Sequence, residues 1–376
     1  MRKISKQIIK AIESRKITIL YGPRQVGKTT LMKSIANRFE NSLFLNAEIP
    51  SVKNLLETKN PEKISSYLGK SKHIFIDEAQ TISEIGLVLK ILYDTFPDIH
   101  IMVTGSSSFE LSSKIHEPLT GRNRTFFLPP LSIEEWQNEK KYSRFEMDNL
   151  LENFLRFGMY PEILSTSSNS EKKDAIIQIS SDYLYKDILQ FQNLKNPKLL
   201  RKLLQALALQ IGSEVSFHEL SQLLKTSSAT IEHYIDLLEK SFIIFSLPAY
   251  STNPRKEIAK KQKIYFYDVG VRNAIIENFQ NLDLRNDIGG LWENFCIVEQ
   301  RKFSERIGKQ GLEFFWRSYS QREVDYIVIE NQKMDAFEYK WNVQKKVKAP
   351  KLFSDLYPNS TFSVLSPENF WEWVLA

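Results

Sequence analysis

The chain has 376 residues and carries 51 lysines and arginines against 45 aspartates and glutamates, a formal net charge of +6. Its hydrophobic content of 42% and charged content of 26% are those of a globular protein, which excludes a disordered or fibrous chain. The longest apolar runs are strand-sized and interrupted, so we expect no transmembrane segment and no membrane partner. The single cysteine, Cys296, excludes an internal disulfide and favours the reducing cytoplasm, and the mild positive charge permits nucleic-acid binding without requiring it.

A glycine-rich motif of the form G-x-x-x-x-G-K-T occupies residues 22–29. It follows a β-like apolar run, residues 17–21, and precedes a helical apolar pattern over residues 30–39. Backbone N–H groups of such a loop bind nucleotide phosphates, and the start of the following helix adds its positive dipole end. By this motif, Lys28 pairs with the phosphates and the Thr29 hydroxyl holds Mg²⁺. The predicted ATP-binding residues of the loop are Gly22, Pro23, Arg24, Gln25, Val26, Gly27, Lys28, Thr29 and Thr30.

A second apolar strand begins at His73 and ends in two acids, Asp77 and Glu78. In a nucleotide site of this kind, the first acid reaches Mg²⁺, directly or through water, and the second orients the water that attacks the γ-phosphate. We therefore predict Asp77 as a metal-site residue and Glu78 as a catalytic residue. The alternative is a buried strand whose two acids are simply solvated at its exposed end.

A third apolar strand, residues 100–105, leads into a run of serines. Polar side chains at that strand end could sense the γ-phosphate, which makes Thr104 and Ser106 candidates. Further along, Arg122 and Arg124 are candidates for stabilising the charge of a nucleotide, including one held by a neighbouring subunit. The alternative for either arginine is an ordinary surface position. The third strand completes an ATPase core over the first 130 residues.

Helical patterns dominate residues 131–192. Apolar residues crowd positions 150–157, and a polar stretch at 165–170 separates two helices. We interpret this region as a helical lid that closes over the nucleotide and transmits its state.

The pattern changes again in residues 193–267, where three amphipathic helices precede two β-like runs joined by a long basic loop. The expected helices are 199–211, 217–224 and 229–240, and the expected strands are 242–245 and 263–267. Three helices followed by a β-wing describe a winged helix-turn-helix.

Charge is distributed unevenly over this predicted winged helix. The third helix carries Glu232, Asp236 and Glu239 against Lys240, which suits DNA phosphates poorly. The wing is basic, and we predict DNA contact through its cationic residues, Arg255, Lys256, Lys260, Lys261 and Lys263. The alternatives are a solvated loop or a protein-docking module.

Two further strands, residues 323–330 and 333–340, are joined by a turn at Asn331-Gln332. Strand alternation places Glu338 and Lys340 on one face, and pairing about the turn brings Asp325 to the same end of the ladder. Two carboxylates and a lysine form the D…E-x-K constellation of metal-dependent nucleases, in which the carboxylates hold Mg²⁺. Glu293, in a helical segment, is a candidate third carboxylate ligand. The alternative is a hairpin with a charged outer face and an ion pair of little energetic value.

These motifs in this order resemble the AAA+ ATPases of bacteria and archaea, in particular a branch with a C-terminal domain of unknown function related to restriction-endonuclease folds. The resembling stretches are Gly22–Thr29, Ile76–Gln80, Thr104–Ser108, Leu119–Arg124, Leu128–Ser132 and Gly158–Pro161. Asp325, Glu338 and Lys340 are similar to the motif of the PD-(D/E)XK nuclease superfamily. The resemblance spans nearly the whole chain and is most specific in the ATPase part.

The predicted fold is therefore α/β. It has a P-loop ATPase core with a parallel sheet and flanking helices (1–130), a helical lid (131–192), a winged helix-turn-helix (193–267) and a restriction-endonuclease-like α/β domain (268–376). The predicted activity is Mg²⁺-dependent ATP hydrolysis coupled to action on DNA. One rival is a nucleotide-gated switch or scaffold for protein partners, with an inactive nuclease-like domain. A small-molecule kinase is weaker, because no acceptor-binding lid is apparent. An arginine acting on a neighbour's nucleotide would require a homo-oligomer.

Overall fold

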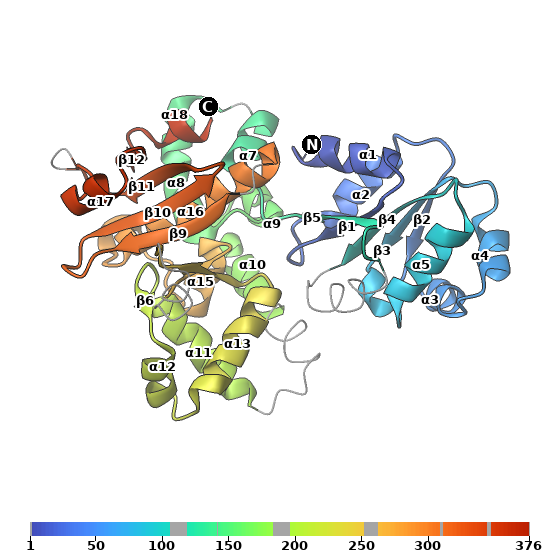
Figure 1. Ribbon diagram of the computed structural model, residues 1–376, viewed down its shortest axis with the longest axis horizontal. Helices are drawn as coiled ribbons and strands as arrows, with labels where there is room; N and C mark the ends of the chain where they lie inside the picture. Colours follow the sequence, from blue (N-terminus) through green and yellow to red (C-terminus); the bar gives the residue numbers. More distant parts are fainter. Residues whose placement is uncertain are drawn as a thin grey trace. The chain divides into compact units, whose positions relative to one another are not determined.

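The computed structural model describes residues 2–105, 119–140, 142–182, 196–251, 262–308, 311–343 and 347–375 (Figure 1). They form two compact units: an N-terminal unit of residues 1–130 with 240–242, and a C-terminal unit of residues 131–239 with 243–376. The predicted boundary at residue 130 thus separates the units, whereas the three ranges predicted beyond it belong to one compact unit. Among the predicted site residues, five lie outside the described ranges: Ser106, Arg255, Lys256, Lys260 and Lys261.

A five-stranded sheet forms the centre of the N-terminal unit. Its strands are β1 (Ile17–Tyr21), β2 (Ser42–Asn46), β3 (His73–Asp77), β4 (His100–Gly105) and β5 (Asn123–Phe127). Their order is β2-β3-β4-β1-β5, and every neighbouring pair is parallel. The three strands predicted from the sequence are therefore confirmed. Because β4 lies between β1 and β3, the carboxyl ends of these three strands are adjacent.

Helices cover both faces of this sheet. They are α1 (Ser5–Glu13), α2 (Lys28–Ala36), α3 (Pro50–Glu57), α4 (Pro61–Leu68) and α5 (Ile85–Thr95). Alternate strand residues such as Ile19, Ile76 and Val103 share one core with α3, α4 and α5. The helices α1 and α2 contact each other and the sheet (Figure 1). Burial on both faces explains why these strands are continuously apolar in sequence.

The first helix after the glycine-rich loop is shifted from its predicted range, 30–39. It begins at Lys28, directly after Gly27, which adopts a left-handed conformation with φ of 92°. It ends at Ala36, because the following turn tightens: Arg38 N donates to Ile35 O and Phe39 N donates to Ala36 O, both three-residue spacings. The helix therefore starts with the residues that the motif assigns to phosphate and metal.

The C-terminal unit opens with four helices, α7 (Ile133–Lys140), α8 (Arg144–Phe157), α9 (Pro161–Ser165) and α10 (Asn169–Asp182). Ser143 and Glu146 form a reciprocal capping box that starts α8. The predicted helical character of this region is confirmed. Its apolar residues, including Trp136 and Phe154, share a core with Trp292 and Phe370, far along the chain. The predicted lid thus packs as part of the C-terminal unit.

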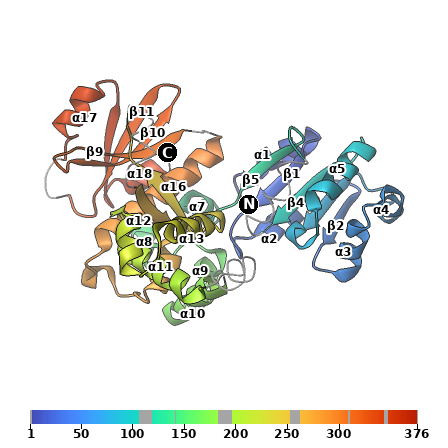
Figure 2. The same cartoon turned by 60° about the horizontal axis from the view of Figure 1, so that its bottom comes forward.

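Three helices and a small sheet follow. They are α11 (Pro197–Leu209), β6 (Glu214–Val215), α12 (Phe217–Leu223), α13 (Ser228–Lys240), β7 (Ile244–Pro248) and β8 (Gln262–Phe266). The three helices lie together in both views (Figures 1 and 2). The sheet is antiparallel in the order β6-β8-β7, with β8 in the middle. The first strand after α13 starts two residues later than predicted because Phe242 has a left-handed backbone, with φ of 57°.

The last part of the chain forms a four-stranded sheet in the order β12-β11-β10-β9. Its elements are α15 (Val269–Ile275), α16 (Ile288–Ile307), β9 (Leu312–Arg317), β10 (Glu323–Glu330), β11 (Lys333–Tyr339), α17 (Lys351–Leu356), β12 (Thr361–Leu365) and α18 (Phe370–Val374). The hairpin of β10 and β11 is confirmed, and its turn residues Asn331 and Gln332 both have positive φ, as a tight hairpin turn requires. Strand β12 pairs with β11 in parallel.

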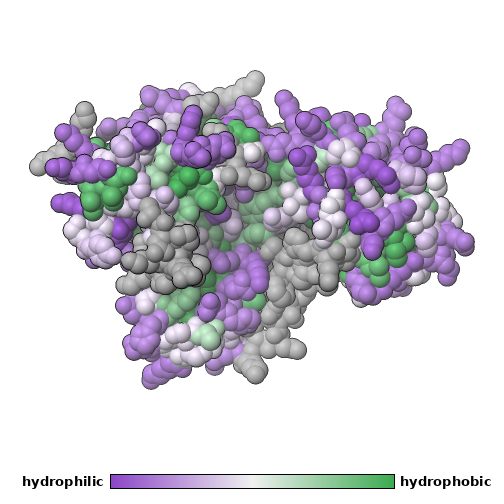
Figure 3. All heavy atoms as spheres, viewed as in Figure 1, coloured by the Kyte–Doolittle hydropathy of each residue, from purple (hydrophilic) through white to green (hydrophobic). Residues whose placement is uncertain are grey.

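The face of the molecule in Figure 3 shows mostly hydrophilic residues, with hydrophobic ones in separate patches. Within the part of the chain that the structure describes, no helix is both long and apolar enough to cross a membrane.

Candidate functional site

The glycine-rich loop follows β1 at the carboxyl edge of the N-terminal sheet. Gly22 is required there, because a Cβ atom at this position would lie 2.3 Å from the carbonyl oxygen of Leu128. Gln25 and Gly27 have left-handed backbones, with φ of 60° and 92°, which turn the chain around the loop and into α2. A loop of this shape, ending at a helix N-terminus, presents N–H groups to an anion.

Lys28 points back into this loop. Its side chain is buried, and its ammonium donates hydrogen bonds to the carbonyl oxygens of Gly22, at 2.8 Å, and Pro23, at 2.5 Å. The positive charge is therefore held inside the loop that the motif assigns to phosphate. The structure places Lys28 as the motif predicts.

Asp77 links the ends of two strands, β3 and β4, and the start of α2. The Thr29 hydroxyl donates to Asp77 Oδ2 at 2.8 Å, and the Thr104 hydroxyl donates to Asp77 Oδ1. Thr29 and Asp77, predicted from separate motifs, are thus in direct contact. Thr104 is fully buried, so it holds Asp77 in place rather than facing a phosphate.

Glu78 follows Asp77 with a left-handed backbone, φ 53°. Its N–H donates to the Thr104 hydroxyl at 3.2 Å, and its carboxylate accepts a hydrogen bond from the Gln80 side-chain amide. A non-glycine residue in this region of backbone space is uncommon and often belongs to a functional site. Gln80, which was not among the predicted site residues, therefore orients Glu78; its position two residues after the acid pair was the available signal.

The predicted arginines lie at the opposite edge of the sheet. The carbonyl oxygen of Arg122 accepts from Ile17 N, at the start of β1, and its guanidinium pairs with Asp94 at 3.2 Å. Arg124, two residues further on and in β5, is exposed and pairs in register with Thr18. Since β1 spans about 13 Å from its first to its last residue, neither arginine is placed to contact a phosphate in its own chain's loop. A role toward a nucleotide stays a prediction that requires a neighbouring subunit.

The predicted carboxylates of the C-terminal sheet converge at one end of the hairpin. Asp325 on β10 and Glu338 on β11 stand opposite each other on neighbouring strands, next to the pair of Tyr326 and Phe337. Lys340 Nζ lies 2.6 Å from Glu338 Oε1 and 3.9 Å from Asp325 Oδ2. The structure therefore brings together the D…E-x-K residues as the sequence predicts.

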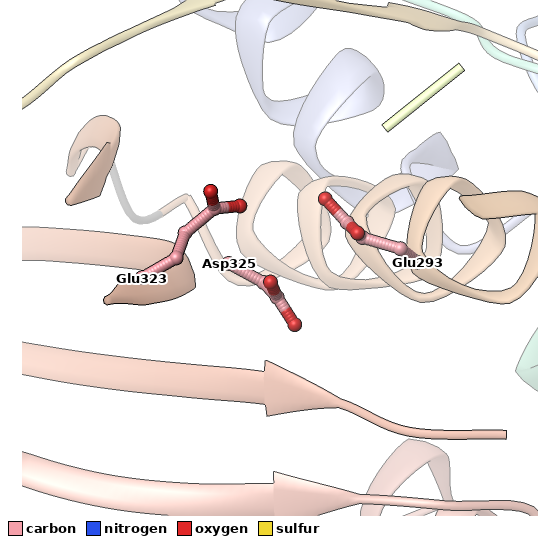
Figure 4. Close-up of side chains that lie close together, drawn as sticks. All are labelled: Glu293, Glu323 and Asp325. Atoms are coloured by element: carbon pink, nitrogen blue, oxygen red, sulfur yellow. The ribbon is translucent and has the colours of Figure 1, made fainter. Parts of the chain in front are cut away.

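Glu293 on α16 joins this cluster together with Glu323 on β10, which the sequence analysis did not select. One carboxylate oxygen from each of Glu293, Glu323 and Asp325 lies within 4.8 Å of the others, and Figure 4 shows the three side chains gathered between strand and helix. Glu323 precedes Asp325 by two residues, so strand alternation was a signal that could have found it.

Lys263 overturns one prediction made from the sequence. It was assigned to a DNA-contacting wing, but its side chain is 1% exposed and cannot reach a DNA backbone. Its ammonium pairs with Glu293 Oε1 at 2.9 Å and with Glu323, while the Tyr265 hydroxyl also donates to Glu293. Sequence reasoning missed this contact because its partners lie 30 and 60 residues further along the chain.

The cluster's electrostatics reflect its burial. Burial raises the pKa of Asp325 to about 6, and the carboxylate of Glu338 adds to the increase. Burial also raises the pKa of Glu293 to about 7, although Lys263 acts in the opposite direction. Burial works to lower the pKa of Lys263, but the charges of Glu293 and Glu323 outweigh it and hold that pKa above its usual value. The pKa values of Glu293 and Asp325 are thus raised by burial even though lysines lie beside them, so the lysines neutralise these carboxylates only in part.

Residues 14–137 match the AAA domain family. A solved structure, a Walker-type ATPase of Pyrococcus abyssi, is similar with a TM-score of 0.50 and 16% identity, over 73% of this chain and 95% of that one. These matches support an AAA-type ATPase. At this level of identity, the structural similarity shows the fold alone.

Two further family models match within the C-terminal unit, and two relatives match most of this chain. Residues 148–282 match the domain of unknown function DUF8612, and residues 288–369 match the domain of unknown function DUF4143. An uncharacterized protein of Methanocaldococcus jannaschii is 26% identical over 363 residues, covering 90% of this chain and 78% of that protein. An uncharacterized protein of Mycobacterium tuberculosis is 26% identical over 344 residues, covering 90% and 73%. The AAA-type region and the C-terminal unit therefore occur together in these relatives.

Proposed function

We propose that the N-terminal unit of this AAA-type protein binds ATP with Mg²⁺ and hydrolyses its γ-phosphate. The observation that carries the proposal is the contact of Thr29 with Asp77, since these are the two groups that hold the metal in a P-loop site. Mg²⁺, when bound, would neutralise charge on the β- and γ-phosphates. The oxygen donors present, a hydroxyl and a carboxylate, are the ligands that Mg²⁺ prefers.

Each polar residue of this site has a distinct role in the proposal. Lys28 exchanges its loop carbonyls for phosphate oxygens and stabilises the charge that develops during transfer. Glu78, oriented by Gln80, positions and polarises the attacking water. Arg122 or Arg124 acts on a nucleotide of a neighbouring subunit, so this part of the proposal implies a homo-oligomer.

The test is the steady-state rate of ATP hydrolysis by the intact protein and by Lys28→Ala. We expect the substitution to lower the rate by about 10²–10³-fold, because it removes a preorganised cation from the developing charge. Lys16→Ala is the matched control, since Lys16 lies just before the opposite end of β1 and bonds to Gly121 O. Equal rates for the intact protein and Lys28→Ala would contradict the proposal.

We further propose that residues 197–266 form a winged helix-turn-helix that binds DNA. The order α11-β6-α12-α13-β7-β8, with β8 between its two neighbours in the sheet, supports this interpretation. Helix α13 carries Glu232, Asp236 and Glu239, so base reading by this helix is disfavoured. With Lys263 buried, DNA contact would rest on the other predicted wing residues.

The C-terminal sheet supports a third part of the proposal, a nuclease-type metal site. The elements follow one another in the order α16-β9-β10-β11-α17-β12. Carboxylates from three of them, α16, β10 and β11, converge on one place. The donor set of carboxylate oxygens fits a divalent cation. In addition, Glu338 Oε2 is buried and has no hydrogen-bond partner among the described residues. Glu293, Asp325 and Glu338 would hold the ion, and Lys340 would orient water or stabilise charge on a scissile phosphate.

A specific observation favours the rival function, a nucleotide-gated switch with an inactive nuclease-like domain. Lys263 already neutralises part of the carboxylate cluster through its contacts with Glu293 and Glu323. Such ion pairs have a purely structural role, so these residues would be present even in a domain that cleaves no DNA.

Cleavage assays separate the two functions. Mg²⁺- or Mn²⁺-dependent cleavage of duplex, single-stranded and branched DNA is measured with and without ATP, for the intact protein and Lys340→Ala. We expect cleavage in the presence of ATP that Lys340→Ala abolishes, whereas Lys333→Ala, at the other end of β11, leaves it unchanged. Absence of cleavage on every substrate, with ATP hydrolysis intact, would favour the switch.

A further inference from the structure

Lys263 occupies an unusual position for a lysine. It lies on β8, the middle strand of the small sheet, where its register partners are Glu214 on β6 and Leu247 on β7. Its side chain is 1% exposed and reaches α16 and β10 of the neighbouring sheet. Lysine is almost never fully buried unless it is paired, so the carboxylates are what make this position tolerable.

The carboxylates around Lys263 outnumber the cations. The acids are Glu293, Glu323, Asp325 and Glu338, and the lysines that pair with them are Lys263 and Lys340, so the sum of formal charges is −4 + 2 = −2. Arg317 lies 3.6 Å from Glu323 Oε2, but it also pairs with Glu214 at 3.0 Å. An excess of carboxylates over cations, in a buried cluster of oxygen ligands, suits a divalent cation.

The ammonium of Lys263 already lies in the position that such an ion would take. Glu293 and Glu323 each direct a carboxylate oxygen at Lys263 Nζ, and these are two of the three residues whose ligand atoms lie within 4.8 Å of one another. An ammonium and a divalent cation cannot share this space, because both need the same oxygens and repel each other.

We propose that the ammonium of Lys263 occupies the place in which Glu293, Glu323 and Asp325 would bind a divalent cation, and thereby keeps the C-terminal site closed to metal in the conformation described. The inference rests on the proposed function in one respect, namely that Glu293 and Asp325 bind a divalent cation. It takes Glu323, whose carboxylate lies with theirs, as the third ligand in place of Glu338. It adds that Lys263 on β8, a strand of the proposed winged helix, controls whether the site can bind a metal ion.

The inference is tested by the binding of Mn²⁺ to nucleotide-free protein, followed by electron paramagnetic resonance of the free ion. Four proteins are compared: the intact protein, Asp325→Asn, Lys263→Gln, and the double variant. Any Mn²⁺ bound near Thr29 and Asp77 is common to all four. We expect Lys263→Gln to bind one Mn²⁺ more than the intact protein and the double variant to lose it. Lys333→Gln, which removes an exposed lysine of the C-terminal sheet, controls for the change in net charge.

The outcomes separate this inference from the proposed metal site. If the intact protein binds an Mn²⁺ ion that Asp325→Asn loses, the inference is overturned and the metal site stands. If Lys263→Gln gains no ion over the intact protein, and neither binds one that depends on Asp325, both fail. Should Lys263→Gln not fold alone, its recovery on refolding is the readout: we expect rescue by millimolar Mg²⁺ or Mn²⁺, but not by KCl of equal ionic strength. No rescue would overturn the inference.

Discussion

Replacing Glu78 by glutamine should lower the rate of ATP hydrolysis by about 10²–10⁴-fold and leave ATP binding almost unchanged. Glutamine keeps the size of the side chain, and its carbonyl can still accept the hydrogen bond from Gln80. It cannot take up a proton or polarise water as a carboxylate does. Because Thr29, Asp77 and Lys28 are untouched, the groups proposed to bind phosphate and metal remain. The measurements are the turnover number and the dissociation constant of a fluorescent ATP analogue.

Glu84→Gln is a closely matched control for this prediction. Glu84 has nearly the same left-handed backbone as Glu78, with φ of 51° against 53°, and precedes a helix in the same way. Its side chain instead pairs with Lys59 on the surface. We expect normal hydrolysis by Glu84→Gln. Wild-type turnover by Glu78→Gln would show that another group positions the water.

Replacing Lys302 by methionine should destabilise the C-terminal unit by about 3–5 kcal/mol, because it leaves a buried carboxylate without its partner. Lys302 Nζ lies 2.8 Å from Glu299 Oε1, and both residues are less than 10% exposed. Glu299 Oε2 also accepts from Ile133 N at 2.9 Å, and Lys302 donates to Leu131 O at 2.9 Å. One ion pair on α16 therefore satisfies the backbone at the point where the C-terminal unit begins.

Urea denaturation of the two proteins measures this effect, with tryptophan fluorescence as the probe, since Trp136, Trp292 and Trp371 belong to the core of this unit. Lys202→Met provides the comparison, because Lys202 is an exposed lysine on α11 of the same unit. We expect that control to change stability by less than about 1 kcal/mol. An equally small change for Lys302→Met would mean that Glu299 finds another partner.

The geometry of the proposed nucleotide site was largely predictable from the sequence. The loop from Gly22 to Thr29 is contiguous, and its function depends on local backbone geometry that glycines and a following helix define. Asp77 could be predicted to lie near this loop, because the carboxyl ends of parallel strands lie at the same edge of a sheet. The hydrogen bond from the Thr104 hydroxyl to Asp77 was not predicted, because only the packing of β4 against β3 shows it.

The positions of Arg122 and Arg124 relative to the glycine-rich loop could not be predicted from their spacing along the sequence. Arg122 follows the serine run in sequence, and the sequence left open whether it acts on its own chain's nucleotide or on a neighbour's. In the fold, the chain returns to the amino edge of the sheet before β5 begins, which takes Arg122 to the start of β1. Direction within a parallel sheet, rather than distance along the chain, decides which residues meet.

By itself, the sequence determined the glycine-rich loop, the two strands whose carboxyl ends carry Asp77 and Thr104, and the hairpin that brings Asp325 close to Glu338, because each depends on local geometry or on strand alternation. Only the tertiary structure decided the environment of Lys263. A lysine in a basic stretch is normally solvated, and nothing nearby in the chain marks this one as buried. Its burial follows from α16 and β10, which bring Glu293 and Glu323 to β8, and a charge can leave water only where such partners repay its desolvation.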